Sequence, residues 1–382
     1  FAEHGLDFLE LGPKEAMATT NGATLILSQG ILAWDRAREL MKIANINTAL
    51  GMEATRGELD AFSINLNAAR CHEGQSVVAK DVRSMLLTSK RVTREAQVVD
   101  FRSPDYLHQL REVIEACDNG GEICVDELKK ELARVPGAPR VQDRYSTRCV
   151  PQVHGSVQET IWACEQVLQD ELNSATDNPL VFLGEQYEDG IKTFSGGNFH
   201  GEPLAHILDA MTKCLTSLAV VSDRRLYALI NSKLSFSLPQ DLSGTDDSDN
   251  TGFMIAQYSV ASRVAHMQAL SFPASVLSIT TSGDQEDYVS MGSVSVHKLL
   301  QVLPYLETVL AVEMLAACQG IDLATEKLPE DLRVLSEKTA KAHERVRARV
   351  SRMYSDRYLY PDIEAVTQLI RDNAFTDLLD DE

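Results

Sequence analysis

The chain has 382 residues, of which 44% are apolar, so it is long enough to bury a large core as one helical domain or several average ones. Its 56 acidic and 36 basic residues give a formal net charge of −20. Nucleic-acid grooves and anionic membrane surfaces need clustered positive charge, and the sequence has no basic block that offsets the acidic excess. The composition therefore predicts a protein that binds neither nucleic acid nor membrane.

The longest apolar stretch, residues 309–318, is interrupted by Glu313. A membrane-spanning helix needs about 20 mostly apolar residues, so we expect none. The seven cysteines are scattered and form no Cys-x-x-Cys pair, which predicts reduced thiols in a cytoplasmic protein and no zinc site. The chain begins at Phe1 without a basic and then apolar leader, so we expect no signal peptide and interpret the chain as a piece of a longer protein.

Apolar residues recur at helical spacing along the chain and strand-like alternation is rare, which predicts a mainly α-helical protein. After Pro151, a stripe of apolar residues at steps of three or four ends before Asn173: Val153, Val157, Ile161, Cys164, Leu168 and Leu172. It predicts one buried face of a helix of about six turns. Residues 203–231, 251–270 and 291–318 are apolar on more than one face and would form a long central bundle.

The predicted helices are joined by polar segments rich in Gly and Asp. Loops held by a rigid scaffold usually carry the chemistry, so we expect the functional residues in four of them: 174–179, 194–203, 240–250 and 281–287. Residues 340–352, rich in Arg, Lys and Ala, predict a solvated helix rather than a binding element. The acidic end, residues 377–382, is expected to fray.

The densest polar cluster is residues 142–148, just before the helix that follows Pro151. Tyr145 and Arg148 are three positions apart and would share one side of a helical turn, with Gln142 one turn earlier. A guanidinium beside a phenol suits a carboxylate held by a bidentate fork while a hydroxyl transfers a proton. An ion-pair network with Asp143 is an equally open interpretation.

A second cluster covers residues 195–202. Its glycines allow close approach of the backbone to a ligand, and Asn198 offers both a donor and an acceptor. A tight turn before a helix would have the same composition. We interpret His200 as a hydrogen-bonded structural histidine rather than a catalyst.

A third cluster, residues 281–288, has three acidic residues within four positions. Glu286 could transfer a proton or bind a nitrogenous ring, although the cluster taken alone is better explained as a solvated loop. Asn21, before a glycine, and Asn178, between Asp177 and a proline, are further candidates or simply turn residues.

Six segments, in this order, resemble the aromatic amino-acid ammonia-lyases, and among them the histidine-specific members: residues 142–152 (QDRYSTRCVPQ), 171–181 (ELNSATDNPLV), 195–203 (SGGNFHGEP), 252–257 (GFMIAQ), 285–291 (QEDYVSM) and 311–320 (AVEMLAACQG). The likeness runs from about Leu9 to Leu323. It implies the long helical bundle of the aspartase and fumarase superfamily, assembled as a homotetramer whose active sites draw on several subunits. The Gly-Ser-Ser-x-Met-Pro loop expected of a fumarase or aspartase is absent from the sequence.

The resemblance implies elimination of ammonia from an L-amino acid to give a trans-2,3-unsaturated acid, without an external cofactor. The family's electrophile is 4-methylidene-imidazole-5-one, formed from an internal Ala-Ser-Gly that this sequence lacks. Residues 281–284 (TSGD) look similar but align with the substrate loop, so we reject them as its source. We interpret residues 1–330 as a lyase domain without its N-terminal segment, which is on a separate chain or lost, and residues 331–382 as a helical tail.

The resemblance also assigns roles to individual residues. Arg148 resembles the substrate carboxylate clamp, and Tyr145 the tyrosine that assists proton transfer. Phe199 resembles the aromatic residue packed against the prosthetic group. Polar contacts to substrate or prosthetic group match four residues: Asn21, Gln142, Asn178 and Gln285.

Glu286 is similar to a glutamate of histidine-specific members, where phenylalanine-specific relatives carry glutamine. A carboxylate can hydrogen-bond an imidazole but would be an uncompensated charge beside a benzene ring. The sequence therefore predicts conversion of L-histidine to trans-urocanate. Four departures from the family pattern, Asp284, Tyr288, Arg144 and Thr147, leave open a phenylalanine or tyrosine ammonia-lyase or a 2,3-aminomutase. A non-catalytic scaffold subunit without the electrophile is the alternative of another class.

Overall fold

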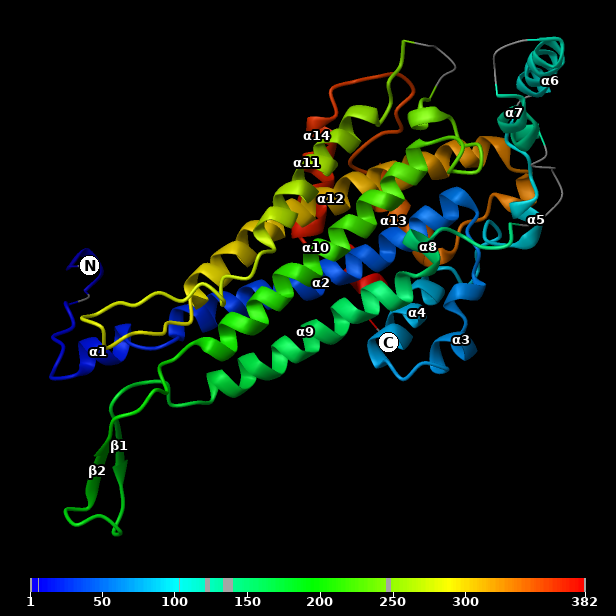
Figure 1. Ribbon diagram of the computed structural model, residues 1–382. Coiled ribbons are helices and arrows are strands. Elements are labelled where there is room, and N and C mark those ends of the chain that lie inside the picture. The colour runs from blue at the N-terminus through cyan, green and yellow to red at the C-terminus, as the bar shows by residue number, and fades with distance from the viewer. Residues whose placement is uncertain are drawn as a thin grey trace. The chain divides into compact units, whose positions relative to one another are not determined.

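The computed structural model describes residues 2–5, 7–102, 104–120, 124–132, 140–244 and 249–380 (Figure 1). Long helices dominate it, as the apolar periodicity predicts: α2 (Thr24–Thr55), α9 (Val150–Leu172), α10 (Glu202–Ile230), α11 (Met254–Leu270) and α12 (Gly292–Lys327). The shorter helices are α1 (Glu15–Thr20), α3 (Ile64–Ala68), α4 (Glu73–Met85), α5 (Arg94–Gln97), α6 (Pro104–Asp118), α7 (Val125–Leu132), α8 (Tyr145–Arg148), α13 (Glu337–Arg347) and α14 (Tyr360–Arg371). The prediction of a mainly α-helical fold is confirmed.

Helix α9 follows the predicted stripe closely. Val157, Ile161, Cys164 and Leu168 are all buried, while Leu172 is exposed because it is the last helical residue before a polar loop. The prediction that Leu172 belongs to the buried face is therefore wrong. Helix α12 continues nine residues beyond the predicted end at residue 318, to Lys327.

Among the described residues, α10 and α12 are long and apolar enough to cross a membrane by length and composition alone, which the interruption at Glu313 did not predict. Their most apolar 18-residue windows are 56% and 72% buried inside the structure. A helix at the centre of a bundle must be apolar on several faces and meets the same criterion. Burial against neighbouring helices therefore accounts for the apolar character of both helices.

A short antiparallel hairpin between α9 and α10 was not expected from the sequence. Strands β1 (Leu180–Leu183) and β2 (Ile191–Phe194) pair with Leu180 opposite Phe194 and Leu183 opposite Ile191. Most of its residues are exposed, so the alternation that marks a half-buried strand is missing. The hairpin brings the chain from the end of α9 back to the start of α10.

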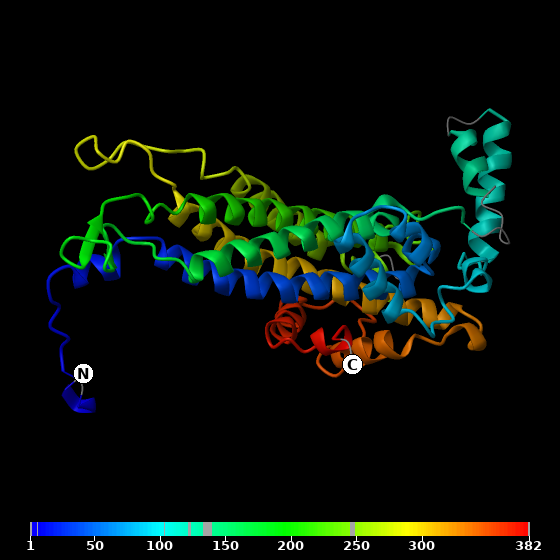
Figure 2. The same ribbon diagram turned by 90° about the horizontal axis from the view of Figure 1, so that it is seen from below.

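The chain forms two compact units. Unit 1 comprises residues 1–37, 160–214 and 268–303, and unit 2 comprises residues 38–159, 215–267 and 304–382. In unit 2, α6 and α7 pack against each other (Figure 2), and α13 packs against α4. The prediction of a solvated helix at residues 340–352 is thus partly wrong. The observed helix, α13, covers Glu337–Arg347, and one of its faces is buried through Thr339, Ala342 and Val346.

Two glycines let α4 and α9 approach closely within unit 2. A Cβ on Gly155 would lie 2.5 Å from the backbone nitrogen of Gln75, and a Cβ on Gly74 would lie 2.4 Å from the carbonyl oxygen of Gly155. Real Cβ atoms do not approach backbone atoms this closely, so only glycine fits at both positions. This contact packs the first half of α9, which follows the α8 turn directly, against α4.

Candidate active site

The α8 turn in unit 2 carries two of the predicted site residues. The guanidinium carbon of Arg148 lies 4.5 Å from the centre of the Tyr145 ring, so the two side chains share one side of the turn as predicted. The Tyr145 side chain is exposed, whereas Nε of Arg148 is buried. The structure shows no hydrogen bond or ion pair to the Arg148 side chain from any residue that it describes. Arg148 is thus a cation, held against an aromatic ring, that can bind an external anion.

The ion-pair network that the sequence offered as an alternative also exists, but it does not include Arg148. The buried carboxylate of Asp143 lies 2.7 Å from Nη1 of Arg140 and accepts a hydrogen bond of 2.7 Å from the backbone N–H of Glu58. Asp143 therefore anchors the segment that leads into α8. The structural and functional interpretations of this cluster apply to different residues within it.

Gln142 is not one turn earlier on the same helix, and that prediction is wrong. The helix begins at Tyr145, and Arg144 has extended dihedral angles (φ −64°, ψ 159°). Arg144 is held there because its guanidinium donates to the carbonyl of Leu234 and lies 5.7 Å from the centre of the Phe236 ring. This departure from the family pattern thus has a structural role.

Sequence reasoning missed a buried polar network that contacts this turn. Arg225 of α10 pairs with Glu313 of α12, and its Nη1 donates to the carbonyl oxygen of Ser146 within α8 at 3.4 Å. Nε2 of His154, in α9, lies 3.2 Å from the same nitrogen. The signal in the sequence is Glu313, a charged residue inside the otherwise apolar stretch 309–318.

In unit 1, Asn21 and Asn178 are brought together through Asp177. Asp177 accepts hydrogen bonds from Nζ of Lys14 (2.6 Å), Nδ2 of Asn21 (3.1 Å) and the backbone N–H of Asn178 (2.7 Å). These donors, led by Lys14, hold the pKa of the Asp177 carboxyl below its ordinary value. The carboxylate therefore fixes both asparagines in one place.

The loop that precedes α10 joins the same group of segments. The backbone N–H of Gly196 donates to Oδ1 of Asn178 (2.8 Å), and Nδ2 of Asn198 donates to the carbonyl of Ala175 (3.3 Å). Gly22 has φ 115°, and a Cβ there would lie 2.5 Å from the carbonyl oxygen of Thr176. Two of the four polar segments, 174–179 and 194–203, therefore meet beside Asn21 and Gly22, as expected for a site built from loops.

Glu286 and Gln285 are exposed on the loop at residues 281–288. Thr281 donates from its backbone N–H to the Glu286 carbonyl and from its hydroxyl to Oε2, both at 2.9 Å. These bonds leave Oε1 of Glu286 as an acceptor on the surface of unit 1. The loop is solvated, and it presents the carboxylate in a fixed orientation.

Tyr288 on this loop contacts the segment around Phe199, which is half-buried. Its hydroxyl donates to Oε1 of Glu202 (3.2 Å), and that carboxylate raises the pKa of Tyr288. The His200 ring stacks on Tyr288, and its Nε2 lies 3.2 Å from the Tyr288 carbonyl oxygen. The interpretation of His200 as a structural histidine agrees with these contacts.

The predicted site residues therefore form two groups. Unit 1 holds Asn21, Asn178, Phe199, Gln285 and Glu286. Unit 2 holds the remainder, of which Tyr145 and Arg148 are in contact: Gln142, Tyr145 and Arg148.

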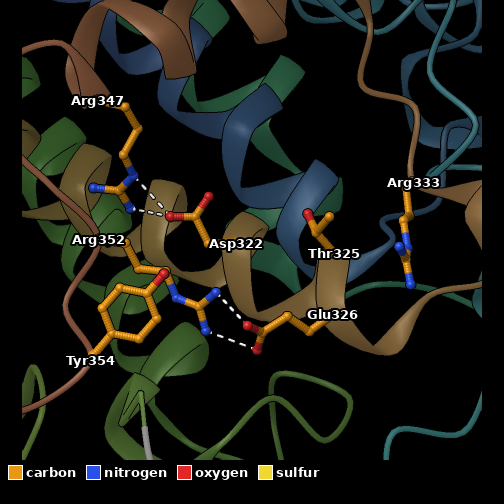
Figure 3. Close-up of a pocket in the computed structure, with 7 residues that line it drawn as sticks. All are labelled: Asp322, Thr325, Glu326, Arg333, Arg347, Arg352 and Tyr354. Carbon is orange, nitrogen blue, oxygen red and sulfur yellow. Dashed lines mark hydrogen bonds and ion pairs between the residues drawn. The ribbon is translucent and has the colours of Figure 1, made fainter.

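A cavity of about 390 Å³ in unit 2 is a less suitable candidate. It lies beside the end of α12 and is lined by Asp322, Thr325, Glu326, Arg333, Arg347, Arg352 and Tyr354 (Figure 3). Four of its five charged side chains form two ion pairs: Nη2 of Arg347 lies 2.8 Å from Oδ2 of Asp322, and Nη1 of Arg352 lies 2.5 Å from Oε1 of Glu326. The fifth, Arg333, donates from Nε to the carbonyl oxygen of Leu328 at 2.8 Å. No predicted site residue lines it.

Comparison with known proteins identifies the family. Residues 1–348 match the family model described as aromatic amino acid lyase. The histidine ammonia-lyase of Natranaerobius thermophilus is 37% identical over 369 residues, 97% of this chain and 62% of the relative. That of Rattus norvegicus is 38% identical over 371 residues, 97% of this chain and 49% of the relative.

Solved structures agree in fold. The crystal structure of histidine ammonia-lyase from Trypanosoma cruzi has a TM-score of 0.78 at 33% identity, covering 99% of this chain and 61% of that one. Tyrosine aminomutase from Streptomyces globisporus has a TM-score of 0.82 at 33% identity, covering 99% and 65%. The chain thus spans about half to two thirds of the length of these relatives, and it belongs to the aromatic amino acid lyase family.

Proposed function

We propose that the protein of which this chain is a part is a histidine ammonia-lyase that converts L-histidine to trans-urocanate and ammonia in the cytoplasm. The observation that carries this proposal is the pair formed by Arg148 and Tyr145, a cation without a partner among the described residues beside an exposed phenol. The relatives from Natranaerobius thermophilus and Rattus norvegicus, both named histidine ammonia-lyase, match 97% of this chain.

In this proposal Arg148 binds the substrate carboxylate. Its planar fork matches a carboxylate in bidentate geometry, and the positive charge needs a counter-ion that the described residues do not supply. Tyr145, whose ring centre lies 4.5 Å from the Arg148 guanidinium carbon, is then beside the bound carboxylate and can hold or transfer a proton. The two residues explain recognition of an amino acid but not the choice of its ring.

Glu286 supplies the preference for an imidazole ring. Its free oxygen can accept a hydrogen bond from an imidazole N–H, whereas a benzene ring would leave the carboxylate desolvated and without a donor. Gln285, beside it, and the amides of Asn21, Asn178 and Gln142 provide further polar contacts to the substrate. Histidine is therefore the substrate that these side chains favour.

The family's electrophile, 4-methylidene-imidazole-5-one, would activate the amino group of the substrate for elimination. The residues of this chain fit such a group, because Asp177 holds the Asn21 amide in place and the Phe199 ring is half-buried on a neighbouring loop of unit 1. Asn21 would hold the group by hydrogen bonds and Phe199 would pack against it. The Ala-Ser-Gly that forms the group would come from an N-terminal segment outside residues 1–382.

We also propose a homotetramer in which several subunits contribute residues to each site, with residues 1–330 as the lyase domain and 331–382 as a helical tail. Exposed apolar side chains in unit 1 support association, among them those of the hairpin: Val181, Phe182, Leu183, Ile191 and Phe194. A monomer would leave these side chains in water.

The test begins with the natively purified protein. Intact mass and a denaturing gel reveal whether an N-terminal chain carrying a dehydrated Ala-Ser-Gly accompanies this one. Product absorbance is then measured with L-histidine, L-phenylalanine and L-tyrosine. Urocanate formation from L-histidine supports the proposal, and a single chain that consumes none of the three favours a non-catalytic scaffold.

Two arginine variants test whether Arg148 binds the substrate carboxylate. Arg148→Lys keeps the charge but loses the fork, so kcat/KM for L-histidine should fall by about a hundredfold. The matched control is Arg352→Lys, because the Arg352 guanidinium also lies over a tyrosine, 4.7 Å from the centre of the Tyr354 ring, but is already paired with Glu326. An equal effect of both variants would contradict the assignment of Arg148.

A second candidate function is a 2,3-aminomutase, which the likeness to tyrosine aminomutase from Streptomyces globisporus favours. An aminomutase would return a β-amino acid rather than free ammonia. Chromatography of the products with each of the three amino acids decides between the two reactions.

A further inference from the structure

The Arg225–Glu313 pair is buried inside unit 2. Arg225 donates from Nε to Oε1 of Glu313 (2.5 Å) and from Nη2 to Oε2 (3.2 Å), and the two side chains are 4% and 1% exposed. Glu313 also accepts from the hydroxyl of Ser222 (2.5 Å) and from Nδ2 of Asn47 (3.2 Å). A buried carboxylate needs such a complete set of donors, so the pair has one defined geometry.

The remaining guanidinium nitrogen of Arg225, Nη1, is oriented by a hydrogen bond to His154. Nη1 of Arg225 lies 3.2 Å from Nε2 of His154, and because a guanidinium can only donate, Nε2 must accept. Nδ1 of His154 lies 2.8 Å from Oδ1 of Asn45, whose Nδ2 donates to Asp81 (2.9 Å). This sequence of donors and acceptors assigns the histidine proton to Nδ1 and leaves the ring neutral.

The same Nη1 atom reaches the turn that carries the candidate clamp. It donates to the carbonyl oxygen of Ser146 at 3.4 Å, and Arg225 also lines a small cavity with Thr147 and Arg144. Ser146 and Thr147 separate Tyr145 from Arg148 in the sequence. A shift of the Arg225 guanidinium would therefore displace the turn that carries both Tyr145 and Arg148.

The α8 turn needs this support because it is too short to be stable alone. It has four residues, and Arg144 at its N-cap provides no side-chain hydrogen bond. Isolated helices of fewer than about 12 residues are marginal even in favourable sequences, so tertiary contacts determine the geometry of such a turn. A charge-assisted bond from a buried, fixed guanidinium is a contact of that kind.

We propose that Arg225 and Glu313 are positioning residues that hold Tyr145 and Arg148 in the geometry for substrate binding, with His154 setting the direction of the Arg225 donor. This inference rests on the proposed function only in that the clamped group is a substrate carboxylate. All three side chains are buried within unit 2, so in this proposal they act through α8 rather than on the substrate.

The test compares two buried glutamates of unit 2 in the natively purified protein. Glu313→Gln removes the charge opposite Arg225. The matched control is Glu53→Gln, because Glu53 is equally buried and accepts bonds from Ser89 (2.7 Å), Thr339 (2.7 Å) and the Ser336 N–H (2.9 Å), none of which belongs to α8. The first readout is the NMR signal of the ¹³C-labelled Tyr145 ring, assigned with Tyr145→Phe. The second is the KM for L-histidine.

Glu313→Gln should move the Tyr145 signal and raise KM by about tenfold with a smaller change in kcat, because the carboxylate clamp is displaced. Glu53→Gln should lower the melting temperature without moving the signal or KM. If both variants lose stability and neither moves the Tyr145 signal, Glu313 is merely structural and the proposal is wrong. A moved signal in a protein that consumes no amino acid would retain the positioning role and reject the proposed function.

Variants of His154 and Arg225 keep the test decisive if Glu313→Gln does not fold. A glutamine at position 154 can accept from Arg225 and donate to Asn45, so His154→Gln should preserve the Tyr145 signal while His154→Leu moves it. Arg225→Lys keeps the charge, but a single ammonium cannot hydrogen-bond to Glu313, His154 and Ser146 at the same time. It should therefore move the Tyr145 signal as Glu313→Gln does. An unchanged signal in both His154→Leu and Arg225→Lys would overturn the proposal.

Discussion

The carbonyl oxygen of Gly155 lies against Gly74, so that a methyl group on Gly74 would be only 2.4 Å from it. The contact is between two helix backbones, which cannot yield as a flexible side chain would. It holds α9 against α4 a few residues after the α8 turn, and its loss would disturb both.

Gly155→Ala should therefore lower the free energy of unfolding by about 1–3 kcal/mol, because overpacking forces the helices apart. Gly51→Ala is the control: Gly51 lies inside α2, and a Cβ there meets no heavy atom within 4 Å. That change should stabilise the protein by about 0.5–1 kcal/mol through helix propensity. Urea unfolding measures both variants, and a loss of stability in Gly51→Ala equal to that in Gly155→Ala would contradict the packing argument.

The cysteines should differ in reactivity. Burial raises the pKa of Cys164 and of Cys318 to about 12, so neither thiol ionises near neutral pH, whereas Cys71 and Cys124 are exposed. Iodoacetamide at pH 8 should alkylate Cys71 and Cys124 in the native protein and reach Cys164 and Cys318 only after denaturation. Peptide mass spectrometry reads each site, and rapid native labelling of Cys318 would show that the α12 region opens.

Stability should fall in mild acid because of His154. Burial, followed by the nearby Arg225 charge, lowers the pKa of His154 well below its ordinary value of 6.5. The unfolded chain takes up a proton as the pH falls below about 6.5 and the folded chain does not. The free energy of unfolding is then largest above that pH and decreases below it, by up to about 1.4 kcal/mol per pH unit.

His154→Gln removes this ionisation and should flatten the dependence in that range. Urea unfolding of both proteins between pH 7 and pH 5 makes the comparison. Parallel curves for the variant and the original chain would assign the acid sensitivity to other groups.

Substrate choice should respond to Glu286. Glu286→Gln removes the carboxylate that we propose accepts the imidazole N–H, so kcat/KM for L-histidine should fall by about tenfold to a hundredfold, while any activity on L-phenylalanine should rise. Asp287→Asn is the control, because it removes the neighbouring exposed charge of the same loop. Equal losses in the two variants would indicate a general effect of loop charge.

The long helices were predictable because their signal is local. The stripe from Val157 to Leu168 repeats at helical spacing and is buried where expected. The hairpin escaped prediction because its strands are four residues long and mostly exposed, so neither alternation nor length distinguished them from a loop. Gln142 was misplaced because contacts of Arg144 with Leu234 and Phe236, about 90 residues away, hold the preceding segment extended.

The candidate site was predictable only in part. Residue types at short spacing correctly placed Arg148 beside Tyr145. The pairing of Arg225 with Glu313 joins positions 88 apart in the sequence, and no local pattern reports such a contact. Charged residues within apolar helices are nevertheless a usable signal that a buried network exists, because each one must find a partner.

Asp177 has a consequence for the thermodynamics of ligand binding. Because Asp177 holds Lys14, Asn21 and Asn178 through hydrogen bonds of the protein itself, the loss of conformational entropy on ordering these segments occurs during folding. A substrate or prosthetic group that arrives later need not order them again, and more of its contact energy appears as affinity. Such a site would bind its ligand with little loop rearrangement, and a variant that loosens Asp177 would weaken binding without altering any ligand contact.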